Sequence, residues 1–138
     1  MAASITAREA SRKTADVVAT PVQTGIKINK GTLVSIDNTG FGRPARSGIA
    51  TDVFAGVSYE SADNTPGVAG AVRARIYKSG SFVFAKNAAT AATDLGQKVY
   101  AADDQTLTLT ATSNTFVGVV VSIVDAANLR IRIDQASQ

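Results

Sequence analysis

The chain has 138 residues, which is enough for one domain that buries most of the surface exposed by its unfolded form. It contains no cysteine and no histidine, so disulfides, thiolate nucleophiles, imidazole bases and zinc sites of the usual His/Cys kind are excluded. The formal net charge of +3 is too small to indicate nucleic-acid binding by itself.

Residues 1–20 differ from the rest of the chain and form the first predicted segment. They are mostly small or polar, with the apolar Ile5 followed by the basic residues Arg8, Arg12 and Lys13. No apolar stripe follows that would bury the face of a helix, and an isolated helix of this length is marginal in water. We therefore expect an extended N-terminal arm that a partner orders.

From Pro21 onward, short segments rich in β-branched residues alternate with turn residues. This spacing predicts an all-β fold: a compact small β-barrel or β-sandwich of short antiparallel strands, in a single β domain of residues 21–138. The Ala/Thr-rich residues 87–94 are compatible with one short helical turn. The expected strands are residues 25–28, 32–36, 53–59, 71–77, 81–85, 97–100, 105–109, 116–124 and 128–133.

Two local features refine this prediction. Gly56 lies inside an expected strand, which indicates a bulge or the close approach of another backbone. Ser79-Gly80 separates two alternating segments and predicts a hairpin between residues 71–77 and 81–85. Phe82 and Phe84 share one face of the second segment, and we expect that face to belong to the core.

Two stretches of the chain present similar residues in the same order, at offsets that shrink along the chain. The first contains Gly31, Val34, Asp37, residues 54–57 (Phe-Ala-Gly-Val) and residues 72–76 (Val-Arg-Ala-Arg-Ile). The second contains Gly96, Val99, Asp103, residues 116–119 (Phe-Val-Gly-Val) and residues 129–133 (Leu-Arg-Ile-Arg-Ile). A repeat of this kind indicates two similar halves, although strands rich in glycine, valine and alanine also match by chance.

Paired arginines occur in both stretches. Period two places Arg73 and Arg75 on one face of their strand, and Arg130 and Arg132 on one face of theirs, each opposite apolar residues. The four side chains form either a basic interface stripe for an acidic partner or the solvated outer face that an alternating strand needs. We favour the solvated face.

Carboxylates that would support catalysis or metal binding stand where turns alone predict them. Asp63-Asn64 and Asp103-Asp104 lack the spaced acidic order of a calcium loop. Glu60 is the sole glutamate beyond the arm, and nothing places a second carboxylate opposite it for glycoside hydrolysis. No glycine motif for phosphate binding follows a strand. We expect no enzyme activity, no cofactor and no metal site.

The remaining classes of partner also leave few signals. A single cluster is suited to stacking nucleotide bases, and it consists of Tyr77, Phe82 and Phe84 near Arg75 and Lys78. We do not favour nucleic acid as a partner. No apolar run is long enough to span a membrane, and the N-terminus lacks the apolar centre of a secretory signal. We expect a soluble protein that is synthesised in a cytoplasm.

With these residues laid out, the chain resembles the capsid decoration, or cement, proteins of tailed bacteriophages over residues 25–133. Each matching element is a glycine-and-apolar pattern, and it is their common order that carries the resemblance. The elements are residues 30–34, 53–57, the turn at 79–80, residues 95–100 and residues 117–120.

The resemblance implies a structural virion protein that binds the outer surface of an assembled capsid and stabilises the shell. Its partners would be the major capsid protein and further copies of itself, as a homo-oligomer with a trimer favoured over a dimer. Synthesis would take place in the host cytoplasm. The resemblance carries over no functional residue, but a protein in this role needs a tether to the shell, and we expect the arm, with Ile5, Arg8, Arg12 and Lys13, to supply it. The alternatives are a tail or baseplate accessory protein and, less favoured, an oligonucleotide-binding β-barrel module.

Overall fold

Twelve short strands and one 3-10 turn make up the secondary structure of residues 16–134, the part of the chain that the computed structural model describes. This confirms the expected all-β fold. The elements are β1 (Val17–Pro21), β2 (Lys27–Ile28), β3 (Leu33–Ile36), β4 (Gly42–Pro44), β5 (Val53–Ser58), β6 (Ala62–Asp63), β7 (Arg73–Tyr77), β8 (Ser81–Lys86), η1 (Ala92–Asp94), β9 (Lys98–Ala101), β10 (Thr106–Thr108), β11 (Phe116–Ile123) and β12 (Asn128–Arg132). The turn η1 falls within the stretch expected to contain a helical turn.

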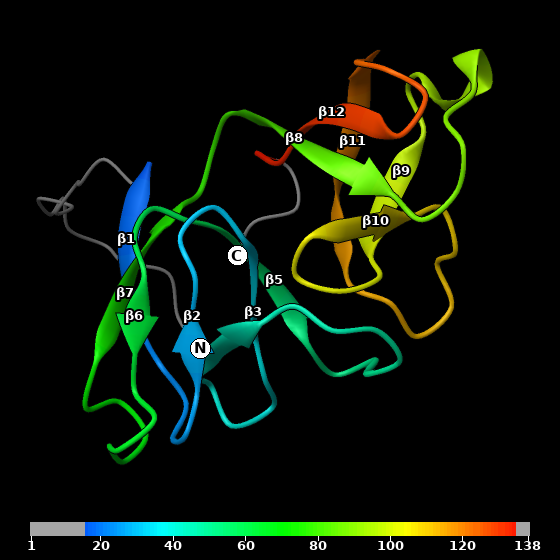
Figure 1. Ribbon diagram of the computed structural model, residues 1–138. Coiled ribbons are helices and arrows are strands. Elements are labelled where there is room, and N and C mark those ends of the chain that lie inside the picture. The colour runs from blue at the N-terminus through cyan, green and yellow to red at the C-terminus, as the bar shows by residue number, and fades with distance from the viewer. Residues whose placement is uncertain (1–15, 135–138) are drawn as a thin grey trace, which may run out of the picture.

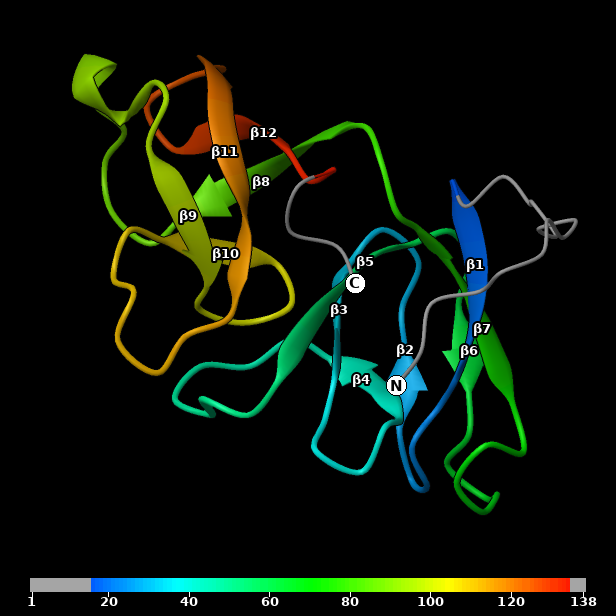
Figure 2. The same cartoon turned by 180° about the vertical axis from the view of Figure 1, so that it is seen from behind.

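The strands form two units that lie side by side (Figures 1 and 2). The first unit holds β1–β7: a five-stranded sheet in the order β1-β7-β5-β3-β4, with the small β2-β6 sheet beside it. The second unit holds β8–β12 and is a closed barrel in the order β8-β12-β11-β9-β10, with β10 returning to β8. In both views β5 lies on the side of the first unit that faces the second.

The two units close in the same way. In the second unit, β10 runs parallel to β8 with Leu107 opposite Lys86, and the amide of Asn87 donates to the Leu107 carbonyl at 2.9 Å. In the first unit, one parallel bridge joins Val22 to Gly42 at the corresponding place, and the amide of Gln23 donates to the Gly42 carbonyl at 2.9 Å. The first sheet is therefore a barrel of the same topology, closed by a single bridge.

A bulge in β5 interrupts its pairing with β3. Val34 lies opposite Gly56, and Ser35 lies opposite Phe54, so Ala55 has no partner residue on β3. An unpaired residue of this kind bends the strand and increases its twist, which helps a short sheet to curl. The bulge expected at this point of the sequence is confirmed.

The second unit carries the same irregularity between β9 and β11. Val99 lies opposite Gly118, and Tyr100 lies opposite Phe116, so Val117 is the unpaired residue. Because strand order, closure and bulge all correspond, the repeat is a property of the structure. The expectation of two similar halves is confirmed.

A glycine follows the bulge residue in each unit for a steric reason. A Cβ atom on Gly56 would lie 2.0 Å from the carbonyl oxygen of Tyr77 on β7, and one on Gly118 would lie 2.2 Å from that of Arg132 on β12. No side chain fits at such separations. Glycine therefore allows β7 to approach β5 in the first unit and β12 to approach β11 in the second.

The structural repeat corrects the sequence match in its last strand. Val57 lies opposite Tyr77 in the first unit, and Val119 lies opposite Arg132 in the second. Counting back along β7 and β12 from these positions, Arg75 corresponds to Arg130. The sequence match had paired Arg75 with Arg132, two residues further on.

The hairpin predicted across Ser79-Gly80 is wrong. β7 pairs with β1 and β5 in the first unit, whereas β8 pairs with β12 and β10 in the second. The connecting backbone bonds to other segments: the Gly80 amide donates to Asp134 Oδ1 at 2.6 Å, and its carbonyl accepts from Ile133. Gly80 has a φ of 111°, which permits this change of direction. The turn is a crossover between units.

Two hydrophobic clusters make up the core of residues 16–134. The first lies inside the first unit and consists of Val22, Ile28, Val34, Ala55, Ala62, Ala74 and Ile76. The second combines the interior of the barrel with four residues of the first unit, namely Leu33, Ala45, Phe54 and Val57. Since the second cluster draws on both units, they share a core and form one body. Phe84 is buried in this cluster and Phe82 packs against it, as expected.

The glycines after the bulges provide a test of the fold. We predict that Gly56→Ala and Gly118→Ala each lower the free energy of unfolding by about 3 kcal/mol, because a strand must move to admit the Cβ atom. Gly25→Ala is the control: Gly25 has a positive φ, as Gly56 does and Gly118 does not, and its Cβ atom would meet nothing within 4 Å. The control should lose about 1 kcal/mol in chemical denaturation, the cost of the left-handed backbone alone. Equal losses at all three positions would contradict the steric account.

Candidate interaction surfaces

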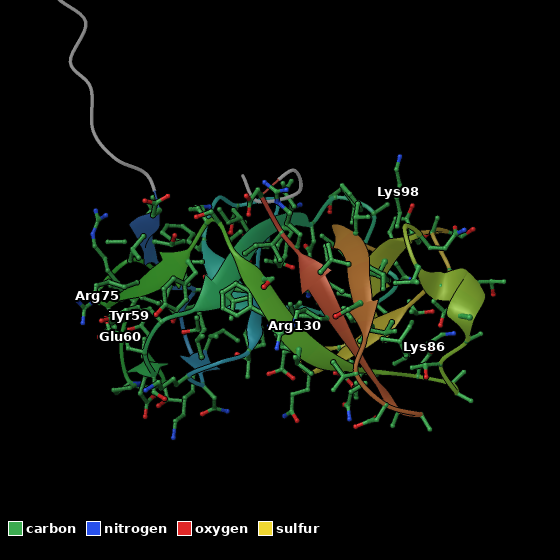
Figure 3. All side chains as sticks on the ribbon, turned by 90° about the horizontal axis from the view of Figure 1, so that it is seen from above. Tyr59, Glu60, Arg75, Lys86, Lys98 and Arg130 are labelled. Atoms are coloured by element: carbon green, nitrogen blue, oxygen red, sulfur yellow. The ribbon has the colours of Figure 1, made fainter. Side chains whose placement is uncertain are left out.

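The four candidate arginines all point outward, and they do not form one continuous stripe. Arg73 and Arg75 are exposed on β7 of the first unit, and Arg130 and Arg132 are exposed on β12 of the second. Arg75 and Arg130 lie well apart on the two units in Figure 3. Arg132 is paired with Asp134 at 3.2 Å. The two strands therefore present separate pairs of basic side chains.

Arg75 belongs to a fixed cluster with Glu60 and Tyr59 at the edge of the first unit (Figure 3). Its guanidinium donates to both carboxylate oxygens of Glu60, at 2.9 and 2.8 Å, and lies 4.7 Å from the centre of the Tyr59 ring. The hydrogen bonds from Arg75 lower the pKa of Glu60. Glu60 thus has an arginine partner that the sequence did not reveal, and it serves as an ion-pair carboxylate.

An aromatic row connects the two units. The ring of Tyr77 lies 5.1 Å from that of Tyr59 and 5.6 Å from that of Phe82. These rings line a groove of about 320 Å³, which Lys30 borders on the first unit and Val83 on the second. The groove marks the seam where the second unit lies on the first.

The same row was the candidate for stacking nucleotide bases. Tyr77 and Phe82 contact each other, and Phe84 belongs to the shared core. The ammonium group of Lys78 donates to the carbonyl of Ala55 at 2.7 Å, and burial lowers the pKa of Lys78. These side chains are used to join the units, which leaves little of their surface for bases.

The carboxylates considered for calcium hold turns instead. Asp63 Oδ1 accepts from the Thr65 amide at 3.0 Å, and Asp103 Oδ1 accepts from the Gln105 amide at 2.7 Å. The side-chain amide of Asn64 donates to three backbone carbonyls. Within residues 16–134, no group of three or more His, Cys, Asp or Glu side chains gathers in a way that could hold a metal ion.

Two ion pairs with buried carboxylates escaped the sequence analysis. Lys86 and Asp94 are joined at 2.9 Å, both nearly fully buried, and Asp94 also accepts from the Ala91 amide at the start of η1. Arg46 and Asp52 are joined at 2.7 Å across the loop between β4 and β5. Each pair closes a loop of its own unit, so we assign both a structural role.

Asp37 organises the turn between β3 and β4. It is 6% exposed and accepts hydrogen bonds from Gln23, from Thr39 and from the Phe41 amide. Burial raises its pKa, but the hydrogen bonds from Thr39, Gln23 and Phe41 outweigh that effect and lower the pKa from 3.8 to about 2. The ionised carboxylate is therefore the form that the fold stabilises.

The four candidate arm residues, Ile5, Arg8, Arg12 and Lys13, lie outside the described residues. Residues 17–20, which the sequence analysis placed in the arm, instead belong to β1, and β1 pairs with β7 over five residues. Just before β1, the Asp16 carbonyl accepts from the Lys78 amide, and its carboxylate accepts from Ser79 at 3.1 Å. The point of attachment is thus tied to the crossover between the units.

Comparison with known proteins identifies one match. A sequence model of the phage cement protein family matches residues 11–135. This range includes both units and the arm residues Arg12 and Lys13. No curated protein and no solved structure matches the chain. In the described part of the chain, no helix has the length and apolar character needed to cross a membrane.

The low pKa of Asp37 leads to a prediction for acid stability. Since its pKa is depressed in the folded state, the stability it contributes is complete above about pH 4 and is lost as the pH falls toward about 2. The loss corresponds to about 2 kcal/mol. Asp37→Asn should remove most of this decline, as measured by chemical denaturation at several pH values. Parallel curves for the variant and the original protein between pH 4 and 2 would contradict this assignment.

Proposed function

Because the chain belongs to the phage cement protein family, we propose that it binds the outer surface of an assembled phage capsid and stabilises the shell. Members of this family are structural phage proteins that bind the capsid, so the protein acts at the virion capsid. The proposal adds the outer surface, the major capsid protein as the direct partner and association with further copies of this chain. We expect no catalytic activity.

The shared core supports this role. A protein that reinforces a shell must resist deformation between its points of contact. Leu33 and Phe54 of the first unit are buried in the hydrophobic cluster of the second, with 0% and 1% of their surface exposed. The two units therefore cannot separate without exposing large apolar side chains, which is unfavourable in water.

The attachment of β1 supports a tether. Five residue pairs join β1 to β7, and Asp16 bonds to Lys78 and Ser79 at the crossover. A force applied to the arm is consequently passed to the sheet and to the junction of the units. Residues 1–15 carry three basic residues and Ile5, a composition suited to an acidic surface with an apolar recess.

A shell offers many equivalent binding positions, so each single contact can have a low affinity. If copies associate with one another, several arms bind at once, and the effective concentration of each arm near its site is high. Weak single contacts then give firm decoration. The observation that carries the proposal is the family match over residues 11–135, which spans both units.

The tether predicts the effect of a deletion. Removing residues 2–14 leaves Asp16 and β1 intact, so we expect the fold to persist while occupancy of the capsid is lost. The measurement is co-sedimentation of the purified protein with bare, expanded shells, with circular dichroism and thermal unfolding as controls. The full chain should also raise the temperature at which the shells disrupt. Undiminished binding by the deleted form would contradict the tether.

A pair of charge variants distinguishes the arm from the body. The arm variant Arg8→Glu, Arg12→Glu, Lys13→Glu should lose capsid binding, since it reverses the charge of the tether. The body variant Lys27→Glu, Arg73→Glu, Arg130→Glu makes the same change in net charge at exposed positions of the two units. It should bind as the original chain does in the same sedimentation assay. Loss of binding in the body variant alone would instead favour the arginine faces as the contact.

A further inference from the structure

Within the chain, the outer face of β3 and β5 is covered by the second unit. Leu33, Phe54 and Val57 on this face are 0%, 1% and 2% exposed and belong to the hydrophobic cluster of the barrel. The amide of Leu33 donates to the carbonyl of Asp104, at 2.8 Å, in the turn between β9 and β10. The covering surface combines this turn with β11, which lies against β5, and with β8, whose Phe84 is buried in the shared cluster and whose Val83 borders the seam.

The repeat defines the same face on the second unit. The amide of Gly31 donates to the Ser58 carbonyl at 2.9 Å, and the amide of Gly96 donates to the Val120 carbonyl at 3.0 Å. Both glycines have a φ of 79°. Counting from these equivalent bonds along β3 and β9, Leu33 corresponds to Lys98.

The same count along β5 and β11 gives the rest of the face. Phe54 and Val57 correspond to Phe116 and Val119. These two side chains are only half-buried, and the next outward residue, Val121, is 46% exposed. Phe116 packs against the shared hydrophobic cluster, whereas Val119 and Val121 leave the rest of this face more exposed than the face of β3 and β5.

The repeat also defines the surface that would cover it. β1 pairs with β7 as β8 pairs with β12, with Ala19 opposite Arg75 and Val83 opposite Arg130. Ala19 therefore corresponds to Val83 at the seam, and it is exposed. The first unit thus retains an exposed copy of the β8 part of that surface, whereas β5, the counterpart of β11, is already covered by the second unit.

We propose that the outer face of β9 and β11, formed by Lys98, Phe116, Val119 and Val121, binds the β1 side of a second copy of this chain. The contact repeats between copies the β8 part of the packing that joins the two units within one copy. It is a head-to-tail contact, so copies form a closed ring if the rotation closes and a filament if it does not. This inference deepens the self-association within the proposed function.

The face of β9 and β11 differs from the covered face of β3 and β5 in ways that suit a contact between separate molecules. Lys98 takes the place of the buried Leu33, extends away from the ribbon in Figure 3, and its ammonium group lies 5.8 Å from the centre of the Phe116 ring. Tyr100 takes the place of Ser35 and lies 5.9 Å from the same ring. An aromatic centre with a charged and polar rim is typical of interfaces whose partners are soluble before they meet.

The test uses one variant on each side of the proposed contact. Val119→Asp places a charge in the β11 face, and Ala19→Lys places one on β1. Each should weaken self-association by about tenfold or more, as expected for a charge in an interface centre. Val121→Asp is a second face variant at a more exposed position, and Val68→Asp, at a site 75% exposed on a loop, is the matched control. Sedimentation velocity measures the oligomers, with thermal unfolding as the check of folding.

Mixing the variants gives the decisive result. The Ala19→Lys chain retains an intact β11 face, and the Val119→Asp chain retains an intact β1 side, so an equal mixture should form dimers through one undamaged contact. Dimers in the mixture but not in either variant alone support the head-to-tail contact. Oligomers that Ala19→Lys leaves unchanged, or an original chain that stays monomeric at all concentrations, overturn it. Arm variants should self-associate normally, which keeps a failure of capsid binding distinct from a failure of this contact.

Discussion

The structure depends on the burial of one face of the first unit beneath the second. The side chains of Leu33, Phe54 and Val57 lie on the outer face of their own sheet and belong to the hydrophobic cluster of the barrel. Each such side chain contributes about 1.5–3 kcal/mol when it is fully removed from water. A chain with few aromatic residues and no disulfide gains in this way a core larger than either small unit would hold alone. The rigidity expected of a cement protein follows from that shared core.

This burial also determines which surfaces of the protein are available to partners. The covered face cannot bind partners, whereas its counterpart on β9 and β11 is partly exposed at Val119 and Val121. The arm leaves the body beside Lys78 and Ser79, at the crossover between the units. In the function we propose, one body holds a shell through its arm and a neighbouring copy through its second unit. No reactive group is needed for either task, in keeping with a family of structural proteins.

Sequence reasoning located most strands and the repeat, because alternation and glycine placement are local signals. It missed pairing, which is not local. A period-two pattern looks the same after a shift of two residues. The sequence match therefore aligned Arg75 with Arg132, whereas the structure aligns Arg75 with Arg130. Ser79-Gly80 signals a turn but does not say which strands it joins. The short β4 (Gly42–Pro44) has too few residues to alternate, and its partners are known only from the folded chain. The Lys86–Asp94 pair was hidden for the same reason.

Electron cryo-microscopy of shells saturated with the protein, at a resolution that traces strands, tests most directly whether copies decorate the capsid and join one another through their repeated faces. It should show both units of each chain on the outer surface, residues 1–15 against the major capsid protein, and the β9–β11 face covered by β1 of a neighbouring copy. A density in which that face is open to solvent, or in which the protein occupies a tail structure and not the capsid lattice, would contradict this proposal.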